Sequence, residues 1–117
     1  MIKSHHRKKL SRTSSHRRAL LKNLAESLFL HEKIETTLSK AKELVSYSDR
    51  IITAARPNDV NARRAVSRHI QNEQIRKKIF DVLVPRYQER KGGYTKVYKT
   101  GFRRGDQAET ALVKLVS

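Results

Sequence analysis

The stretch Lys91-Gly-Gly-Tyr-Thr-Lys-Val-Tyr-Lys-Thr-Gly-Phe-Arg-Arg-Gly-Asp106 decides the fold class, because the hydrophobic pattern of the chain changes there. Its double glycine ends the helical pattern that precedes it. Tyr94–Phe102 and the later Thr110–Val116 are rich in β-branched and aromatic residues, which favour strands. A turn with a Gly-Asp dipeptide separates the two segments, so the sequence predicts an antiparallel hairpin.

The residues before this hairpin have a mainly helical pattern. One stripe at helical spacing consists of Ala41, Leu44, Ser48, Ile51 and Ala55. Residues that can cap helices stand at the predicted starts, and prolines stand near two of the predicted ends. The first predicted helix covers about residues 15–30, and a short strand covers 32–37. The second helix follows a cap at Thr37 or Ser39 and ends at Arg56–Pro57; the third follows the turn Asn58–Asp59 and runs through Ile70; the fourth begins after Asn72 and stops near Pro85. The predicted fold is α+β: a two-layer α/β domain of about four helices packed on a small mixed sheet.

Basic residues dominate the composition, with 27 Lys and Arg against 11 Asp and Glu and a net charge of +16. The first 25 residues hold eight Lys or Arg and no Asp or Glu. Such a segment cannot neutralise itself, so it needs an external polyanion or remains a self-repelling, solvated tail. Nucleic acid is the partner class that best fits this charge.

The chain divides into a basic N-terminal arm, residues 1–13, and a single globular domain, residues 14–117, which is the natural expectation at 117 residues. Cations in the arm alternate with Ser and Thr hydroxyls, and both groups bind phosphate oxygens. A flexible tail that only aids solubility is the alternative. The candidate RNA-binding residues of the arm are Lys3, His5, His6, Arg7, Lys8, Lys9 and Arg12.

The start of the first predicted helix is the next candidate site. Its first turn is basic, which opposes the helix dipole, and a bound phosphate would relieve that opposition. Serine hydroxyls just before it can cap the helix. The candidates here are Ser14, Ser15, His16, Arg17, Arg18 and Lys22, and a weaker face on the third predicted helix adds Arg63, Arg64 and Arg68.

The hairpin region, residues 86–106, is the second main candidate site. Gly92 and Gly93 let the backbone approach a ligand closely, because they carry no side chain. Tyr94, Tyr98 and Phe102 alternate along one strand and could present rings to unstacked bases. We expect Tyr98 and Phe102 to face the core and Tyr94 to be more open to a contact. The candidates are Arg90, Lys91, Gly92, Gly93, Tyr94, Lys96, Arg103 and Arg104.

Catalytic and metal chemistry find little support in the sequence. The absence of Cys excludes disulfides, thiolate nucleophiles and cysteine-ligated metals. The isolated histidines predict no metal and no cofactor, and we expect a protein that is not an enzyme. An RNA-cleaving enzyme would need clustered carboxylates with a divalent metal. We instead expect the candidate carboxylates to lie on solvated faces as partners of nearby Lys: Glu32, Glu35, Glu43 and Asp49.

Targeting and membrane signals are also weak. No apolar run approaches the roughly 18 residues of a membrane span, and no hydrophobic segment follows the basic start as in a secretory signal. The Arg- and Ser-rich start also describes an organelle transit peptide, but residues 1–18 hold few large apolar side chains for an amphipathic helix. We expect neither a membrane nor a small-molecule substrate as a partner.

Five blocks, in order along nearly the whole chain, carry a family resemblance. They are Leu10-Ser-Arg-Thr-Ser-Ser-His-Arg-Arg-Ala19, His31-Glu-Lys-Ile-Glu-Thr-Thr37, Lys40-Ala-Lys-Glu43, Arg90-Lys-Gly-Gly-Tyr-Thr-Lys-Val-Tyr-Lys-Thr-Gly-Phe-Arg-Arg-Gly-Asp106 and Ala111-Leu-Val-Lys-Leu115. Together they resemble the bacterial large-subunit ribosomal protein seventeen family. The family's usual opening, Arg-His-Arg-Lys followed by Gly-Arg, is replaced here by Lys3-Ser-His-His-Arg-Lys-Lys9.

The resemblance implies a structural constituent of the large ribosomal subunit. Such a protein binds large-subunit rRNA near the peptide-exit side, contacts neighbouring large-subunit ribosomal proteins and catalyses no reaction. Lys40 and Lys42 of the third block join the candidate RNA-binding residues. A cytoplasmic bacterial ribosome is favoured over an organellar one. The alternative, from charge alone, is a small basic DNA-binding or nucleoid protein, which would dimerise and place a recognition helix in the major groove.

Overall fold

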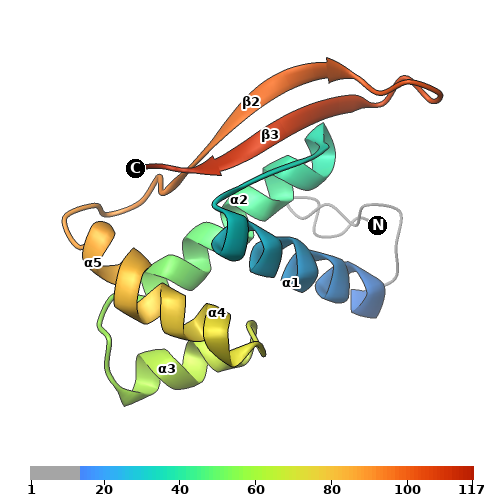
Figure 1. Cartoon of the computed structure of the whole chain (residues 1–117). Helices are drawn as coiled ribbons and strands as arrows, with labels where there is room; N and C mark the ends of the chain where they lie inside the picture. The colour runs from blue at the N-terminus through green and yellow to red at the C-terminus, as the bar shows by residue number, and fades with distance from the viewer. Residues whose placement is uncertain (1–13) are drawn as a thin grey trace, which may run out of the picture.

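The computed structural model describes residues 14–117, so the predicted basic arm lies outside the described residues. The predicted helices and strands are present, although the third helix ends before Ile70 (Figure 1). In order, the elements are α1 (Ser14–His31), β1 (Lys33–Thr37), α2 (Leu38–Ala55), α3 (Val60–Ser67), α4 (Glu73–Lys78), η1 (Ile79–Leu83), α5 (Val84–Arg86), β2 (Thr95–Phe102) and β3 (Glu109–Leu115).

The three strands form one sheet in the order β1-β3-β2, and both pairs of neighbours are antiparallel. The predicted hairpin of β2 and β3 is therefore confirmed, but the sheet is antiparallel throughout and not mixed. The reason is the direction of β1, which pairs with β3 from Lys33–Lys114 onward in the opposite sense. A bulge between Lys99 and Gly101 shifts the register of β2, and Gly101 has a φ of +132°, which glycine adopts without steric cost.

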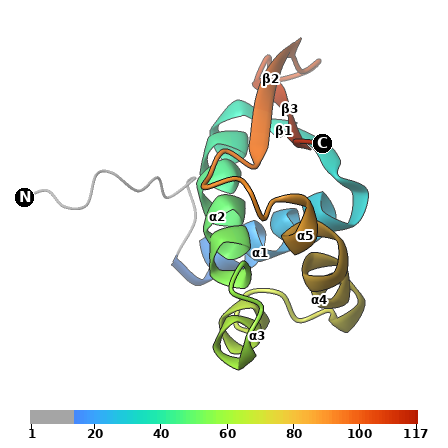
Figure 2. The same cartoon turned by 90° about the vertical axis from the view of Figure 1, so that its left-hand side faces the viewer.

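All described helices lie on one side of this sheet (Figures 1 and 2). The long helix α2 lies next to the sheet, and its apolar stripe is buried as predicted: Ala41, Leu44, Ser48, Ile51 and Ala55. The inner face of β3 adds the buried side chains Ala111, Val113 and Leu115. Burying one Leu, Ile or Val side chain contributes about 1.5–3 kcal/mol, so this contact between the helical and sheet layers is a main source of stability.

The fourth predicted helix is one helical body in three parts, α4, η1 and α5. Asn72 caps its start, because the Asn side chain accepts from the N–H groups of Gln74 and Ile75. The middle part is π-helical, and the Val84 N–H donates to the carbonyl of Ile79. Pro85 follows directly; it has no N–H, and its ring crowds the preceding turn, so a widened turn accommodates it.

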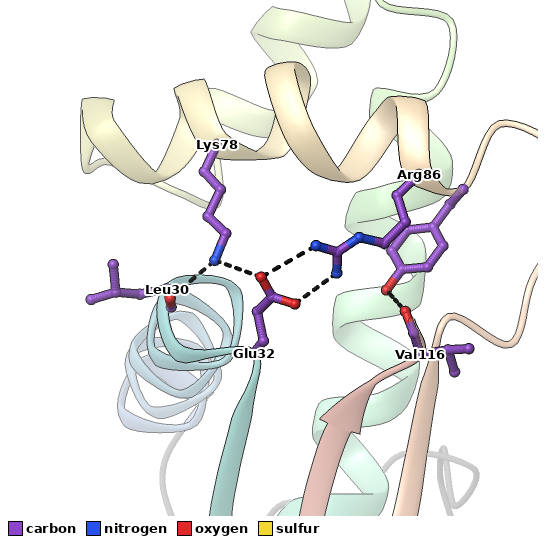
Figure 3. A network of polar contacts seen from close by, with 6 residues as sticks. Leu30, Glu32, Lys78, Arg86 and Val116 are labelled. Carbon is purple, nitrogen blue, oxygen red and sulfur yellow. Dashed lines mark hydrogen bonds and ion pairs between the residues drawn. The ribbon is translucent and has the colours of Figure 1, made fainter.

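Glu32 joins α1, the fourth helical body and the sheet (Figure 3). Its carboxylate accepts two hydrogen bonds from the Arg86 guanidinium, at 2.7 and 3.3 Å, and lies 3.1 Å from the Lys78 ammonium. Its carbonyl accepts from the Leu115 N–H at 2.9 Å. The bonds from Arg86, and then those from Lys78, lower the pKa of Glu32 from 4.5 to about 2. Glu32 also has a φ of +66°, a left-handed conformation that costs a non-glycine residue about 1 kcal/mol.

Three of the four candidate carboxylates connect distant elements, so the expectation that they are solvated partners of nearby Lys is wrong for them. Glu32 forms the contacts above, and Glu43 of α2 binds Arg17 of α1 at 2.6 Å. Asp49 of α2 accepts from Thr95 Oγ1 of β2 at 3.1 Å, and burial raises the pKa of this carboxyl. Glu35 is exposed on β1. Residue spacing within one element predicts only partners in the same element. The partners of these three carboxylates lie in other elements, so the sequence did not predict them.

Candidate nucleic-acid interface

The cations at the start of α1 have different roles. Arg17 donates to Glu43, and both side chains are mostly buried, with 12% and 16% of their surfaces exposed. Arg18 is exposed, and Lys22 on the next turn is half-buried. The first turn of α1 has no acidic residue, so the unfavourable charge near the positive end of the helix dipole is real. Arg17 therefore stabilises the α1–α2 contact, whereas Arg18 forms no ion pair within residues 14–117.

A cavity of about 280 Å³ opens between α1, α2 and α3. Its polar lining includes Arg17, Arg18, Arg50 and the pair Tyr47–His69, which is hydrogen-bonded between Oη and Nδ1 at 2.9 Å. Burial and the neighbouring cations lower the pKa of His69. Sequence reasoning missed Arg50, although its spacing of three residues from Tyr47 places both on one face of α2.

The candidate face on α3 is only partly available. The Arg63 guanidinium lies 4.5 Å from the centre of the Phe80 ring and donates to Asn58 Oδ1 at 3.0 Å. Arg63 thus holds α3 to the fourth helical body through a cation–π contact. Arg64 and Arg68 are exposed, and neither forms an ion pair within residues 14–117.

Our expectation that Tyr94, beside the double-glycine loop, is open to a contact is wrong, because its side chain is completely buried. Its ring packs against Tyr87, with 5.2 Å between ring centroids, and its hydroxyl lies 3.4 Å from Thr53 Oγ1 and 3.5 Å from Arg56 Nη1. Gly93 has a φ of +65°, which suits glycine. Burial closes the Tyr94 ring to any ligand, so Tyr94 leaves the set of candidate contacts.

Tyr98 and Phe102 are also placed against expectation, because both are exposed, at 49% and 68%. Tyr98 lies on the face of the sheet turned away from the helices, because its strand neighbour Val97 pairs with the buried Val113. The outer part of the hairpin, where β2 ends at Phe102, extends past the helices and has no core beneath it (Figure 1). Strand residues bury their aromatic rings only where another layer covers them. Tyr98 lies opposite Leu112 of β3, and Phe102 lies opposite Glu109 beyond the bulge.

The basic residues of the loop and hairpin also divide into bonded and outward groups. Arg103 donates to both carboxylate oxygens of Asp106, at 3.1 and 2.5 Å, and this lowers the pKa of Asp106 to about 2. Arg90 donates to the carbonyl of Gly93 at 3.2 Å. Arg104, at the hairpin tip, is exposed. Lys42 of α2 lines a hollow with Ala108 and Glu109, so the start of α2 lies beside the base of the hairpin turn.

The structure thus brings the candidates into two groups, one around the start of α1 and one along the loop, the hairpin and the start of α2. Several candidate cations form no ion pair with any residue in 14–117: Arg18, Lys22, Lys40, Lys42, Arg64, Lys91, Lys96 and Arg104. Candidates before Ser14 lie outside the described residues.

Within residues 14–117, no three His, Asp or Glu side chains gather as they would to hold a metal ion. Among the helices of the same residues, none has the length and apolar character needed to span a membrane.

The fold and the site define a class: a small, strongly basic α+β protein whose candidate cations lie around the start of α1 and along the loop, the hairpin and the start of α2. Comparison with known proteins gives the family. The model of the family described as ribosomal protein L17 matches residues 20–116. Two similar relatives are the large ribosomal subunit proteins bL17 of Endomicrobium trichonymphae, 59% identical over the full length of both chains, and of Campylobacter concisus, 52% identical over all of this chain and 99% of the other. The bL17 protein of Helicobacter pylori strain Shi470 is 49% identical over 99% of this chain and 100% of its own. The chain belongs to the ribosomal protein L17 family and is a ribosomal protein.

Proposed function

We propose that this protein is a structural constituent of the large ribosomal subunit that binds large-subunit rRNA and helps to fold and stabilise it. The observation that carries the proposal is the set of candidate cations that form no ion pair among residues 14–117, on a chain whose net charge is +16. Cations that neutralise phosphates supply most of the sequence-independent affinity for nucleic acid.

The proposed interface has two parts on the described body. Arg18 and Lys22 project from the start of α1, where a phosphate would also meet the positive end of the helix dipole. Lys91, Lys96 and Arg104 line the loop and hairpin, and Lys40 and Lys42 lie nearby at the start of α2. The arm, residues 1–13, adds a third, acid-free contact segment in the proposal. The protein works in a bacterial cytoplasm as part of the ribosome, next to other large-subunit proteins.

The test is binding of the full chain to large-subunit rRNA in the presence of excess duplex DNA, measured across a salt series. We expect tight binding that survives the competitor at moderate salt, and a log–log slope that falls by roughly 0.7–0.9 for each phosphate contact removed. Arg18→Ala should flatten the slope by one such contact. Competition by DNA as effective as by rRNA would overturn the rRNA assignment and favour a general DNA-binding protein.

A further inference from the structure

A row of three lysines crosses one face of the sheet. Lys114 of β3 pairs with Lys33 of β1 on one side and with Lys96 of β2 on the other. Directly paired residues point to the same face, with about 4.5–5.5 Å between their Cβ atoms. All three lysines are exposed, and none has an ion-pair partner within residues 14–117. Like charges placed opposite one another destabilise a sheet, so this row weakens the protein when it is alone.

The lysine row lies on the face that no described helix covers. Its strand neighbours Thr95, Val113 and Leu115 are buried, and side chains alternate between the two faces of a strand. The described helices all lie under the opposite face (Figures 1 and 2). The next row on the open face is Glu35–Leu112–Tyr98. Its carboxylate, Glu35, forms no ion pair with the lysines, so the face remains positive.

An aromatic ring stands beside this charge. Tyr98 is 49% exposed, and with Lys96 and Lys114 it lines a hollow of about 260 Å³ whose wall is completed by residues 115–117. The hollow is smaller than the roughly 300–1,000 Å³ of drug-sized pockets. Exposed rings next to cations on an open sheet are the features on which unpaired bases stack while their phosphates are neutralised.

We propose that this open face binds an unpaired segment of large-subunit rRNA, with Lys33, Lys96 and Lys114 neutralising phosphates and Tyr98 stacking on a base. The inference rests on the proposed rRNA binding and adds a surface to it. An acidic protein segment would also match the lysines, but it would not use the exposed ring. An RNA duplex presents phosphates without free base faces, so the ring favours an unpaired strand.

The experiment compares two charge-matched double variants of the full chain. Lys96→Gln with Lys114→Gln removes two cations from the open face, and Lys77→Gln with Lys99→Gln removes two exposed cations elsewhere, one of them from the opposite face of β2. The probe is large-subunit rRNA, with binding measured across a salt series. We expect the first variant to flatten the log–log slope by roughly 1.4, at about 0.7 per single-strand contact, and the second to leave the slope near the wild-type value.

The ring is tested by Tyr98→Ser and Tyr98→Phe. Loss of one stacked base should weaken binding roughly 5-fold to 160-fold for the Ser variant, whereas the Phe variant keeps the ring and the wild-type affinity. Thermal unfolding of each variant checks that the fold is intact, and cross-linking of Tyr98 to rRNA gives a readout that does not depend on affinity.

The outcomes separate this inference from the proposed function. If the wild-type chain does not prefer large-subunit rRNA over DNA, the proposed function fails and this inference fails with it. If the wild-type chain does prefer rRNA but the two double variants share one slope and Tyr98→Ser binds normally, the open face is not an RNA surface and only this inference is overturned. A flattened slope confined to the open-face variant, with weakened binding by Tyr98→Ser, supports it.

Discussion

Glu32 shows how one side chain can connect three elements. Its pKa is lowered from 4.5 to about 2, so its ion pairs stabilise the fold fully above about pH 4.5 and lose that effect as the pH falls toward 2. Glu32→Gln should therefore lower the free energy of unfolding by about 1 kcal/mol at pH 7, a value that allows for the partial exposure of the carboxylate. Urea unfolding at pH 7 and pH 3 measures this difference.

The matched control for Glu32 is Glu35→Gln, because Glu35 is exposed on the adjoining strand and forms no ion pair within residues 14–117. It should leave stability within about 0.5 kcal/mol of the wild type. The difference in the free energy of unfolding between wild type and Glu32→Gln should shrink at pH 3, since Glu32 of the unfolded chain is then mostly protonated, whereas the folded carboxylate is still mostly ionised. A gap of equal size at both pH values would show that charge is not the cause.

Tyr94 and Tyr98 exchange the roles that the sequence suggested for them. Tyr94→Phe removes a buried hydroxyl that lies within 3.5 Å of Thr53 and Arg56, so it should cost about 0.5–1.5 kcal/mol of stability and leave rRNA affinity unchanged. Tyr98→Phe, on the exposed ring, should leave stability unchanged. Thermal unfolding and rRNA binding of the two variants give the comparison. A drop in rRNA affinity for Tyr94→Phe without a drop in stability would restore Tyr94 as a contact residue.

At the scale of single elements, the lysine row on the open face of the sheet predicts how a substitution changes the stability of the free protein. Lys114 stands between Lys33 and Lys96, so Lys114→Gln removes two repulsive pairs at once. We expect it to raise the free energy of unfolding by about 0.2–1 kcal/mol in low salt. Lys99→Gln, on the other face of β2, is the control and should change stability less. Chemical unfolding at low and high salt measures both, and a destabilised Lys114→Gln would show that the row is not repulsive.

The elements also show how far local sequence reasoning reaches. The buried stripe of α2 and the hairpin strands follow from periodicity and residue type, which act over a few residues. The π-helical turn before Pro85 and the inward turn of Tyr94 depend on what packs around them. Side chains of a strand alternate between two faces, and the layer that covers the sheet decides which face is buried. The sequence could therefore assign Tyr98 to a strand but not to a face of the sheet. Pairing each strand residue with its neighbour in an assumed antiparallel register would have revealed the three aligned lysines.

At the scale of the whole molecule, the net charge of +16 sets two opposite responses to salt. Self-repulsion lowers the stability of the free protein, and added salt screens it, because the Debye length falls from about 30 Å at 0.01 M to about 8 Å at 0.15 M. Binding to rRNA weakens over the same salt range, because the release of counterions from the RNA becomes less favourable as the salt concentration rises. We therefore expect the melting temperature of the free protein to rise between 0.01 and 0.15 M sodium chloride, and the rise in melting temperature caused by added rRNA to shrink.

Both responses can be measured in one set of thermal unfolding curves, with and without large-subunit rRNA. The open-face variant Lys96→Gln with Lys114→Gln should show a smaller salt-dependent rise when free, since it carries two fewer repelling charges on one face. The charge-matched variant Lys77→Gln with Lys99→Gln separates the loss of net charge from the loss of the aligned row. A constant melting temperature of the free wild type across this salt range would show that self-repulsion does not contribute significantly to its stability. The excess of cations would then have to be balanced within the folded chain rather than by an external polyanion.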